Sequence, residues 1–109
     1  MAEGEETVEE MAGESMGPLS VASKGFTEQF ILGHMYRLLL EAQGFEVEDK
    51  LGLGTTDIIH TAMLEGEVDL YPEYTSTGLL TVLKAEQMSD RQEIYDTVKA
   101  GYEEQFNIT

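Results

Sequence analysis

Two tyrosines and a group of hydroxyl side chains follow a short apolar run near the middle of the chain. The segment consists of Tyr71, Pro72, Glu73, Tyr74, Thr75, Ser76 and Thr77. A tyrosine face attracts an organic cation by about 0.5–2 kcal/mol per ring, and the hydroxyls offer polar contacts beside it. The segment is therefore suited to a ligand that carries a bulky organic cation, although tyrosines with this spacing are also ordinary core residues.

A second group of polar and aromatic residues lies near the start of the chain. It consists of Ser23, Lys24, Phe26, Thr27 and Gln29, and Lys24 is one of only six cationic side chains. The start of a predicted helix at this point adds unpaired N–H groups and a partial positive charge, which favour an anionic ligand group. A solvated lysine is equally compatible with this position. Together, the two groups would combine an anion-binding point with aromatic faces.

The predicted elements bring both groups to one edge of a sheet. Apolar runs predict strands over residues 19–23, 45–51 and 68–70, and helical spacing predicts helices over 27–43, 56–65, 76–83 and 90–105. This alternation predicts an α/β fold with a parallel three-layer sheet and β-α-β-α-β order. Ligands bind beyond the carboxyl ends of the strands in such sheets, where a third loop supplies Gly54, Thr55 and Thr56.

Apolar residues at helical spacing predict the faces through which two of these helices pack. The faces are Phe30, Ile31, His34, Met35, Leu38, Leu39 and Ala42 in the first helix, and Ile58, Ile59, Ala62 and Met63 in the second. Thr55 is placed to cap the second helix, and Ser89 with Gln92 has the spacing of a capping box at the last helix.

Composition limits both the architecture and the partners. The 109 residues allow one small domain. Residues 1–18 carry glutamates without a basic residue, which predicts a disordered acidic tail or tether, and residues 19–109 form the folded part. The net charge of −16 opposes binding to nucleic acid. No cysteine is present, which excludes disulfides and thiolate metal ligands, and no apolar run approaches the roughly 18 residues of a membrane span.

The sequence does not favour an enzyme. His34 and His60 are the only histidines, and each falls within a predicted helix as a partly buried residue. Glu65, Glu67 and Asp69 lie near a turn, where solvated carboxylates are expected. Because no catalytic triad, phosphate-binding glycine loop or metal-ligand spacing occurs, we predict no catalysis, cofactor or metal.

Two separated motifs resemble those of a known family. They are Ser23, Lys24, Gly25, Phe26, Thr27, Glu28 and Gln29, followed by Ile31, Leu32 and Gly33, and then Glu67, Val68, Asp69, Leu70, Tyr71, Pro72, Glu73, Tyr74 and Thr75. Both are similar to the glycine betaine/choline-binding proteins of osmoprotectant ABC transporters. The resemblance covers residues 19–109. It implies part of one lobe of a type II periplasmic binding protein, in which tyrosines enclose a quaternary ammonium ligand.

The resemblance also implies roles for individual residues. Tyr74 resembles the tyrosine that forms one wall of the aromatic cage. Lys24 resembles the cation that holds the ligand carboxylate, and Thr77 resembles a hydroxyl that binds the same carboxylate. Second candidates are Gln29, Thr27 and Tyr71. Relatives that accept choline alone tend to have an acidic residue at the position of Thr77, so a threonine there favours betaine-type ligands.

Partners and location follow from the same resemblance. It implies that an ABC permease and an ATPase are the protein partners. It also implies that the protein acts outside the cytoplasm, where the N-terminal tail could tether it to a membrane. Members of the family are more than twice as long, so we expect the second lobe and the return segment to be missing and the ligand to bind weakly. Unpaired sheet edges allow a homo-oligomer. The alternative is an acidic protein-interaction or self-associating module that binds no solute.

Overall fold

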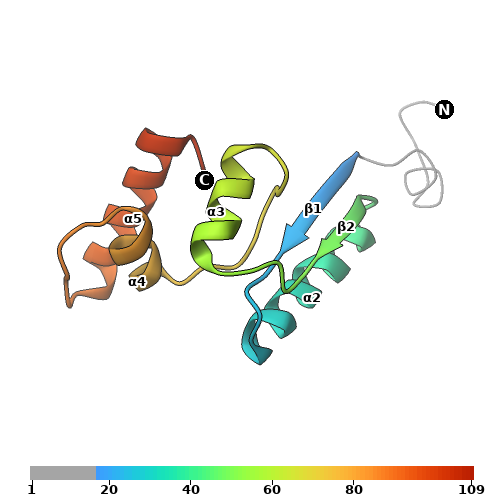
Figure 1. Cartoon of the computed structure of the whole chain (residues 1–109), viewed down its shortest axis with the longest axis horizontal. Helices are drawn as coiled ribbons and strands as arrows, with labels where there is room; N and C mark the ends of the chain where they lie inside the picture. Colours follow the sequence, from blue (N-terminus) through green and yellow to red (C-terminus); the bar gives the residue numbers. More distant parts are fainter. Residues whose placement is uncertain (1–16) are drawn as a thin grey trace.

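The computed structural model describes residues 17–109, so most of the predicted acidic tail lies outside the described part of the chain. Its elements are β1 (Pro18–Ala22), α2 (Thr27–Ala42), β2 (Glu46–Lys50), α3 (Thr56–Leu64), α4 (Thr75–Thr77), the π-helical turn η1 (Gly78–Val82) and α5 (Arg91–Phe106). Their order follows the predicted alternation, and most boundaries lie within one or two residues of those expected from the sequence (Figure 1).

β1 lies at the centre of the sheet. It pairs in parallel with β2, from Pro18 opposite Glu46 to Ala22 opposite Lys50, and α2 forms the crossover between them. On its other side, Val21 forms a single parallel bridge with Leu70. The α/β class and the parallel pairing are confirmed, while the third predicted strand, 68–70, is reduced to this bridge.

Two local features explain why the third strand is so short. The Asp69 carboxylate accepts the Ser20 backbone N–H at 2.8 Å, so a side chain takes the place of a ladder carbonyl. Two residues beyond Leu70, Pro72 has no N–H to donate. Regular pairing therefore extends over very few residues, and the chain leaves the sheet directly before Glu73.

The core joins β1 to α3. Ala22, Ile59, Ala62 and Val68 form one buried cluster, against which Met63 and Tyr71 pack. Ile59 and Ala62 belong to the stripe predicted for this helix, whereas Ile58 of the same stripe is exposed. The Tyr71 ring thus packs against the core, while its hydroxyl donates a hydrogen bond to Glu73.

The apolar face predicted for α2 does not pack against the sheet. Ile31, Met35, Leu38 and Leu39 are 54–65% exposed, and His34, expected to be partly buried, is exposed as well. The buried residues of α2 are Gln29 and Gly33. A Cβ atom at Gly33 would collide with the Leu51 side chain, so the glycine allows α2 to lie close to the residue that follows β2.

The helix caps differ from those predicted. Thr55 is at the N-cap position of α3, but its side chain makes no capping hydrogen bond. At α5 the cap is Asp90 instead of Ser89, and its carboxylate accepts the Glu93 N–H at 2.9 Å. A carboxylate at this position also interacts favourably with the positive end of the helix dipole.

Helix α5 docks on α3 through an aromatic cluster. The His60 ring meets the edge of Phe106 at a centroid distance of 4.5 Å, and Tyr102 packs against both rings. Burial lowers the pKa of His60, and the charge of Asp57 opposes this shift. His60 is therefore the partly buried helix residue that the sequence predicts.

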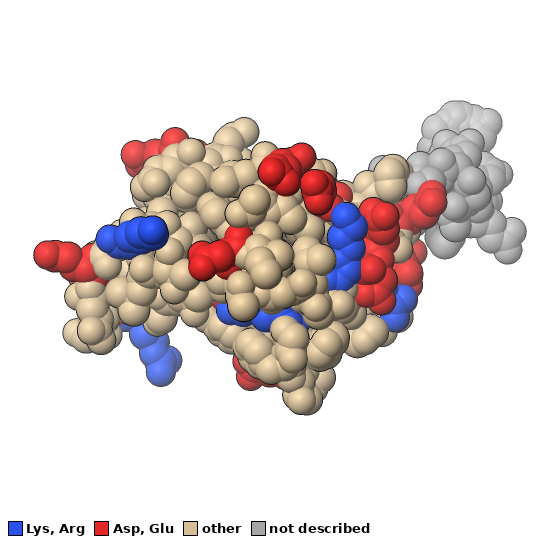
Figure 2. All heavy atoms as spheres, in the orientation of Figure 1, with Lys and Arg blue, Asp and Glu red and all other residues tan. Residues whose placement is uncertain are grey.

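The described part of the chain is elongated, with extents of 53 × 27 × 25 Å. β1, β2 and α2 lie at one end and α4, η1 and α5 at the other, with α3 between them (Figure 1). Acidic side chains gather at the end that carries the sheet (Figure 2), where β2 exposes Glu46, Glu48 and Asp49. None of the helices within residues 17–109 is long and apolar enough to cross a membrane.

Candidate functional site

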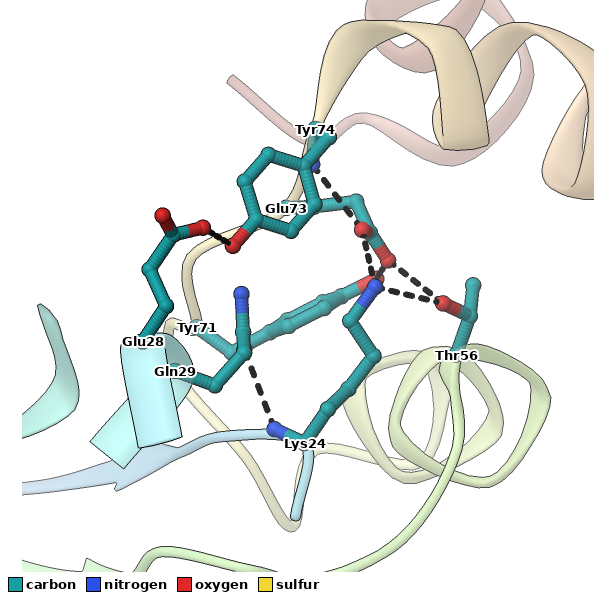
Figure 3. Close-up of polar contacts among 7 residues, drawn as sticks. All are labelled: Lys24, Glu28, Gln29, Thr56, Tyr71, Glu73 and Tyr74. Atoms are coloured by element: carbon teal, nitrogen blue, oxygen red, sulfur yellow. Dashed lines mark hydrogen bonds and ion pairs between the residues drawn. The ribbon is translucent and has the colours of Figure 1, made fainter. Parts of the chain in front are cut away.

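Three segments that are far apart in the sequence meet beyond the carboxyl end of β1. Lys24 follows β1, Thr56 begins α3, and Glu73 and Tyr74 directly precede α4. Their side chains point toward one another in Figure 3, with the Lys24 ammonium beside the Glu73 carboxylate. The edge of the sheet predicted to carry the site is therefore the edge at which these residues lie.

Glu73 is the centre of the hydrogen-bond network. Its Oε1 accepts the Lys24 Nζ–H at 2.6 Å and the Tyr74 backbone N–H at 2.9 Å. Its Oε2 accepts the hydroxyls of Thr56 at 2.7 Å and of Tyr71 at 3.0 Å. Thr56 Oγ1 also accepts from Lys24 Nζ at 3.2 Å, which closes a ring of three side chains. The carboxylate thus has a donor for each of its lone-pair directions.

This arrangement shifts two pKa values in opposite directions. Burial alone would raise the pKa of Glu73, but hydrogen bonds from Lys24, Thr56 and the Tyr74 N–H outweigh burial and hold it below its ordinary value. Burial raises the pKa of Tyr71 strongly, and the adjacent Glu73 charge adds to this effect. At neutral pH, Glu73 is therefore ionised and Tyr71 is a neutral hydrogen-bond donor.

Two neighbouring aromatic rings lie close to the lysine ammonium. The rings of Phe26 and Tyr74 are 6.3 Å apart between centroids and inclined by 18°. Lys24 Nζ lies 5.2 Å from the centroid of Tyr74 and 5.8 Å from that of Phe26. Both distances are within the range of a cation–π interaction. Phe26 is 46% exposed, so its ring is also accessible from solvent.

Gln29 has an amide donor that faces the site. Its side chain is fully buried, and Oε1 accepts the Lys24 backbone N–H at 3.0 Å. Within residues 17–109, its Nε2 makes no hydrogen bond of regular geometry, and it interacts with the Tyr74 hydroxyl. The amide nitrogen points into the space between Tyr74 and the Lys24 side chain in Figure 3. A buried amide without a well-formed hydrogen bond costs up to about 1–3 kcal/mol, so a ligand acceptor beside Tyr74 would gain a donor from Nε2.

Four of the six residues predicted for the site lie together. Lys24, Tyr74, Gln29 and Tyr71 belong to the cluster, with Tyr71 acting through Glu73. Thr27 is exposed in the first turn of α2, and Thr77 is half-buried at the end of α4. The hydrogen bonds that form the cluster include neither of these two hydroxyls, so their roles remain predictions.

Two residues of the cluster were not predicted from the sequence. Glu73 binds Lys24, and Glu28 accepts the hydroxyl of Tyr74. Glu73 carries a usable signal, because an acidic residue between two tyrosines at a strand end faces the loop that holds the chain's rare lysine. Glu28 carries none, since an acid in the first turn of a helix is ordinary.

Residues 17–109 match the family described as the substrate binding domain of ABC-type glycine betaine transport system. The chain belongs to this family. Among individual relatives of this substrate-binding family, it is 39% identical over 92 residues to the ergothioneine transport permease/ergothioneine binding protein EgtU of Helicobacter pylori. It is 34% identical over 101 residues to the carnitine transport binding protein OpuCC of Listeria monocytogenes.

Solved structures support the same assignment. The chain matches apo YehZ of Escherichia coli with a TM-score of 0.76 and 36% identity, over 82% of its own length and 32% of that structure. A glycine betaine/carnitine/choline ABC transporter structure, at 24% identity and a TM-score of 0.68, shares the fold. The matches cover 84% and 91% of this chain but only 16% and 33% of the EgtU and OpuCC sequences. The fold is therefore that of part of a binding-protein lobe of this substrate-binding family.

Proposed function

We propose that the chain is part of the solute-binding component of an ABC importer for glycine betaine or a related quaternary ammonium osmoprotectant. The observation that carries this proposal is the position of the Lys24 ammonium, which faces the rings of both Phe26 and Tyr74. These rings already attract one cation. A ligand with a trimethylammonium group is attracted to the same faces by the same force.

Three groups are available for the carboxylate of such a ligand. Lys24 Nζ has three donors, of which Glu73 and Thr56 take two. Gln29 Nε2 makes no hydrogen bond of regular geometry within the described residues. Thr77 would add a hydroxyl. In this scheme the cation rests on Tyr74 and Phe26, the carboxylate binds Lys24 and Gln29, and no bond is made or broken.

The remaining parts of the proposal follow from the relatives. Capture would occur outside the cytoplasm, and delivery would require an ABC permease and an ATPase. Because this chain spans 16–33% of the length of EgtU and OpuCC, we propose that it supplies one wall of the cage and that further sequence supplies the facing wall. Affinity of this part alone should then be weak, on the order of 1 mM or about −4 kcal/mol.

Nuclear magnetic resonance titration with glycine betaine tests the proposal at such affinities. We expect shifts at the Tyr74 amide and the Gln29 side-chain NH₂ in the unaltered chain. Tyr74→Ala should abolish these shifts. Tyr95→Ala is the matched control, because Tyr95 is an exposed tyrosine of α5 and should leave them unchanged. Absence of betaine shifts in the unaltered chain, or their persistence in Tyr74→Ala, would contradict the proposal.

A protein-interaction module is the second candidate, and the exposed apolar residues of α2 favour it. Ile31, Met35, Leu38 and Leu39 form an apolar surface that faces away from the sheet. Pairing through the outer edge of β2 is less suitable for self-association, because its acidic residues would repel those of a second copy. Sedimentation equilibrium and the betaine titration together discriminate the two candidates. A chain that forms a dimer and gives no betaine shifts supports the interaction module.

A further inference from the structure

We propose that Glu73 is a specificity-determining residue that makes this site select zwitterions over anions. The carboxylate of Glu73 cancels the charge of Lys24, so a ligand carboxylate alone gains little at the site. A ligand binds well only when it also brings a positive charge to the Phe26 and Tyr74 faces. This inference rests on the proposed function and adds the residue that sets the charge type of the ligand.

The position of Glu73 is fixed by its donors. Tyr71, Thr56 and the Tyr74 backbone N–H hold the carboxylate in addition to Lys24. Lys24 and Thr56 come from distant segments, whereas Tyr71 and Tyr74 belong to the segment of Glu73 itself. The side chains of Lys24 and Glu73 are each only 12% exposed. The carboxylate therefore cannot turn away from the site without leaving several buried donors unpaired.

The ion pair leaves the immediate surroundings of Lys24 without net positive charge. One positive and one negative group lie 2.6 Å apart, so a distant anion feels a dipole rather than a full charge. A ligand cation on the aromatic faces, in contrast, is close to a carboxylate whose lone pairs are already occupied by protein donors. Glu73 therefore acts on the ligand by charge and not by direct hydrogen bonding.

Two ligands of the same shape separate these effects. Glycine betaine has a trimethylammonium group, and 3,3-dimethylbutanoate has a tert-butyl group in its place with the same carboxylate. Both fill the same space and offer the same anion to Lys24 and Gln29. The ratio of their dissociation constants therefore reports the interaction of the site with the positive charge alone.

The experiment compares this ratio in Glu73→Gln and in the unaltered chain by the same titration. Glutamine keeps the shape and an oxygen acceptor for Lys24 but removes the charge. We expect the preference for betaine over 3,3-dimethylbutanoate to fall by about tenfold, the effect of one nearby charge in a largely buried site. Glu103→Gln is the control, because it removes the acid of the exposed Lys99–Glu103 pair in α5 and should leave the ratio unchanged.

A second variant gives the opposite sign and does not depend on the folding of the first. Lys24→Gln leaves Glu73 without its counter-charge, so the site becomes negative and should shift its preference from betaine toward choline by a similar factor. An unchanged betaine to 3,3-dimethylbutanoate ratio in folded Glu73→Gln overturns the inference, as does an unchanged betaine to choline ratio in Lys24→Gln. Absence of betaine binding to the unaltered chain is a different result, since it overturns the proposed function itself.

Discussion

Lys24 Nζ lies 2.6 Å from Glu73 Oε1, and both side chains are largely removed from water. The other two ion pairs within residues 17–109, Arg37–Glu41 and Lys99–Glu103, are i,i+4 pairs on exposed helix surfaces. Exposed pairs of this kind contribute about 0–1 kcal/mol. The Lys24–Glu73 pair differs because loss of one partner leaves buried polar groups unpaired, and its contribution can therefore be measured.

Replacement of Glu73 by alanine should destabilise the fold. Lys24, Thr56, Tyr71 and the Tyr74 N–H would all lose their acceptor, and we expect the free energy of unfolding to fall by about 2–4 kcal/mol. Urea denaturation followed by circular dichroism measures this change. The control Glu103→Ala should alter the free energy by less than about 0.5 kcal/mol, and equal effects of the two variants would contradict the prediction.

The stabilisation by Glu73 should depend on pH. Its pKa in the fold is below the ordinary value of 4.5, so the unfolded chain binds a proton at Glu73 first as the pH falls. The contribution is fully present above pH 4.5 and is lost as the pH falls through the folded pKa. We therefore expect the difference in unfolding free energy between the unaltered chain and Glu73→Gln to be constant near neutral pH and to shrink in acid. If this difference in unfolding free energy grew on acidification, the pKa of Glu73 would be raised by folding and not lowered.

Tyr102→Phe should leave the fold as stable or make it more stable. The buried Tyr102 hydroxyl has no hydrogen-bond partner in the described residues, so its removal should raise the unfolding free energy by up to about 1 kcal/mol. Burial, with a smaller effect of the Glu73 charge, raises the pKa of Tyr102 to about 12.

The same variant has a signature in alkali. Between the ordinary pKa of 10.0 and the folded value of about 12, the unfolded chain loses the Tyr102 proton and the folded chain keeps it. The unaltered chain should therefore lose stability relative to Tyr102→Phe as the pH rises above 10. Thermal unfolding of both proteins across this range measures the effect, and parallel curves would show that the hydroxyl is solvated.

Gly52→Ala should destabilise the loop that follows β2. Gly52 has φ of 75°, and an added Cβ would lie 2.9 Å from the Phe30 ring. The left-handed conformation alone costs a non-glycine residue about 1–2 kcal/mol, and we expect at least this loss in the free energy of unfolding. Gly25→Ala is the matched control, because a Cβ there meets no atom within 4 Å. A larger effect at Gly25 than at Gly52 would refute the assignment.

Leu39→Lys should have little effect on the stability of the monomer. Leu39 is 65% exposed on the face of α2 that points away from the sheet, so we expect a change of less than about 0.5 kcal/mol. Ile59→Ala in the core should cost about 2–5 kcal/mol. Urea denaturation of both variants provides the comparison. If Leu39→Lys costs as much as Ile59→Ala, this face of α2 is packed in solution.

The sequence was sufficient to predict the element order and the edge at which the site lies. Alternating strand and helix patterns fix the crossover between β1 and β2, and Pro72 limits pairing beyond Leu70. Lys24 and Tyr74 meet because parallel strands end at the same edge of a sheet. These inferences depend on local residue patterns and on the parallel direction of successive strands, and both can be read from a single sequence.

Other features depend on side-chain partners that one sequence does not reveal. The face of α2 that meets the sheet is marked by Gln29 and Gly33, because a close approach requires a small residue and a buried amide needs a partner. Apolar spacing selected the opposite face. The position of Glu73 between two tyrosines at a strand end indicates a partner in the Lys24 loop, but it does not predict that Tyr71 and Thr56 also donate to the same carboxylate.

The ring of contacts around Glu73 joins the two ends of an elongated chain. Lys24 extends from β1, whereas Glu73 and Tyr74 lead into α4 and from there to η1 and α5. Within each end, amide protons should exchange with solvent as one cooperative unit. Between the ends, cooperativity depends on these buried hydrogen bonds together with the packing of α3 against β1 and against α5. A bound ligand would therefore slow amide exchange in α5, although α5 contributes no residue to the site.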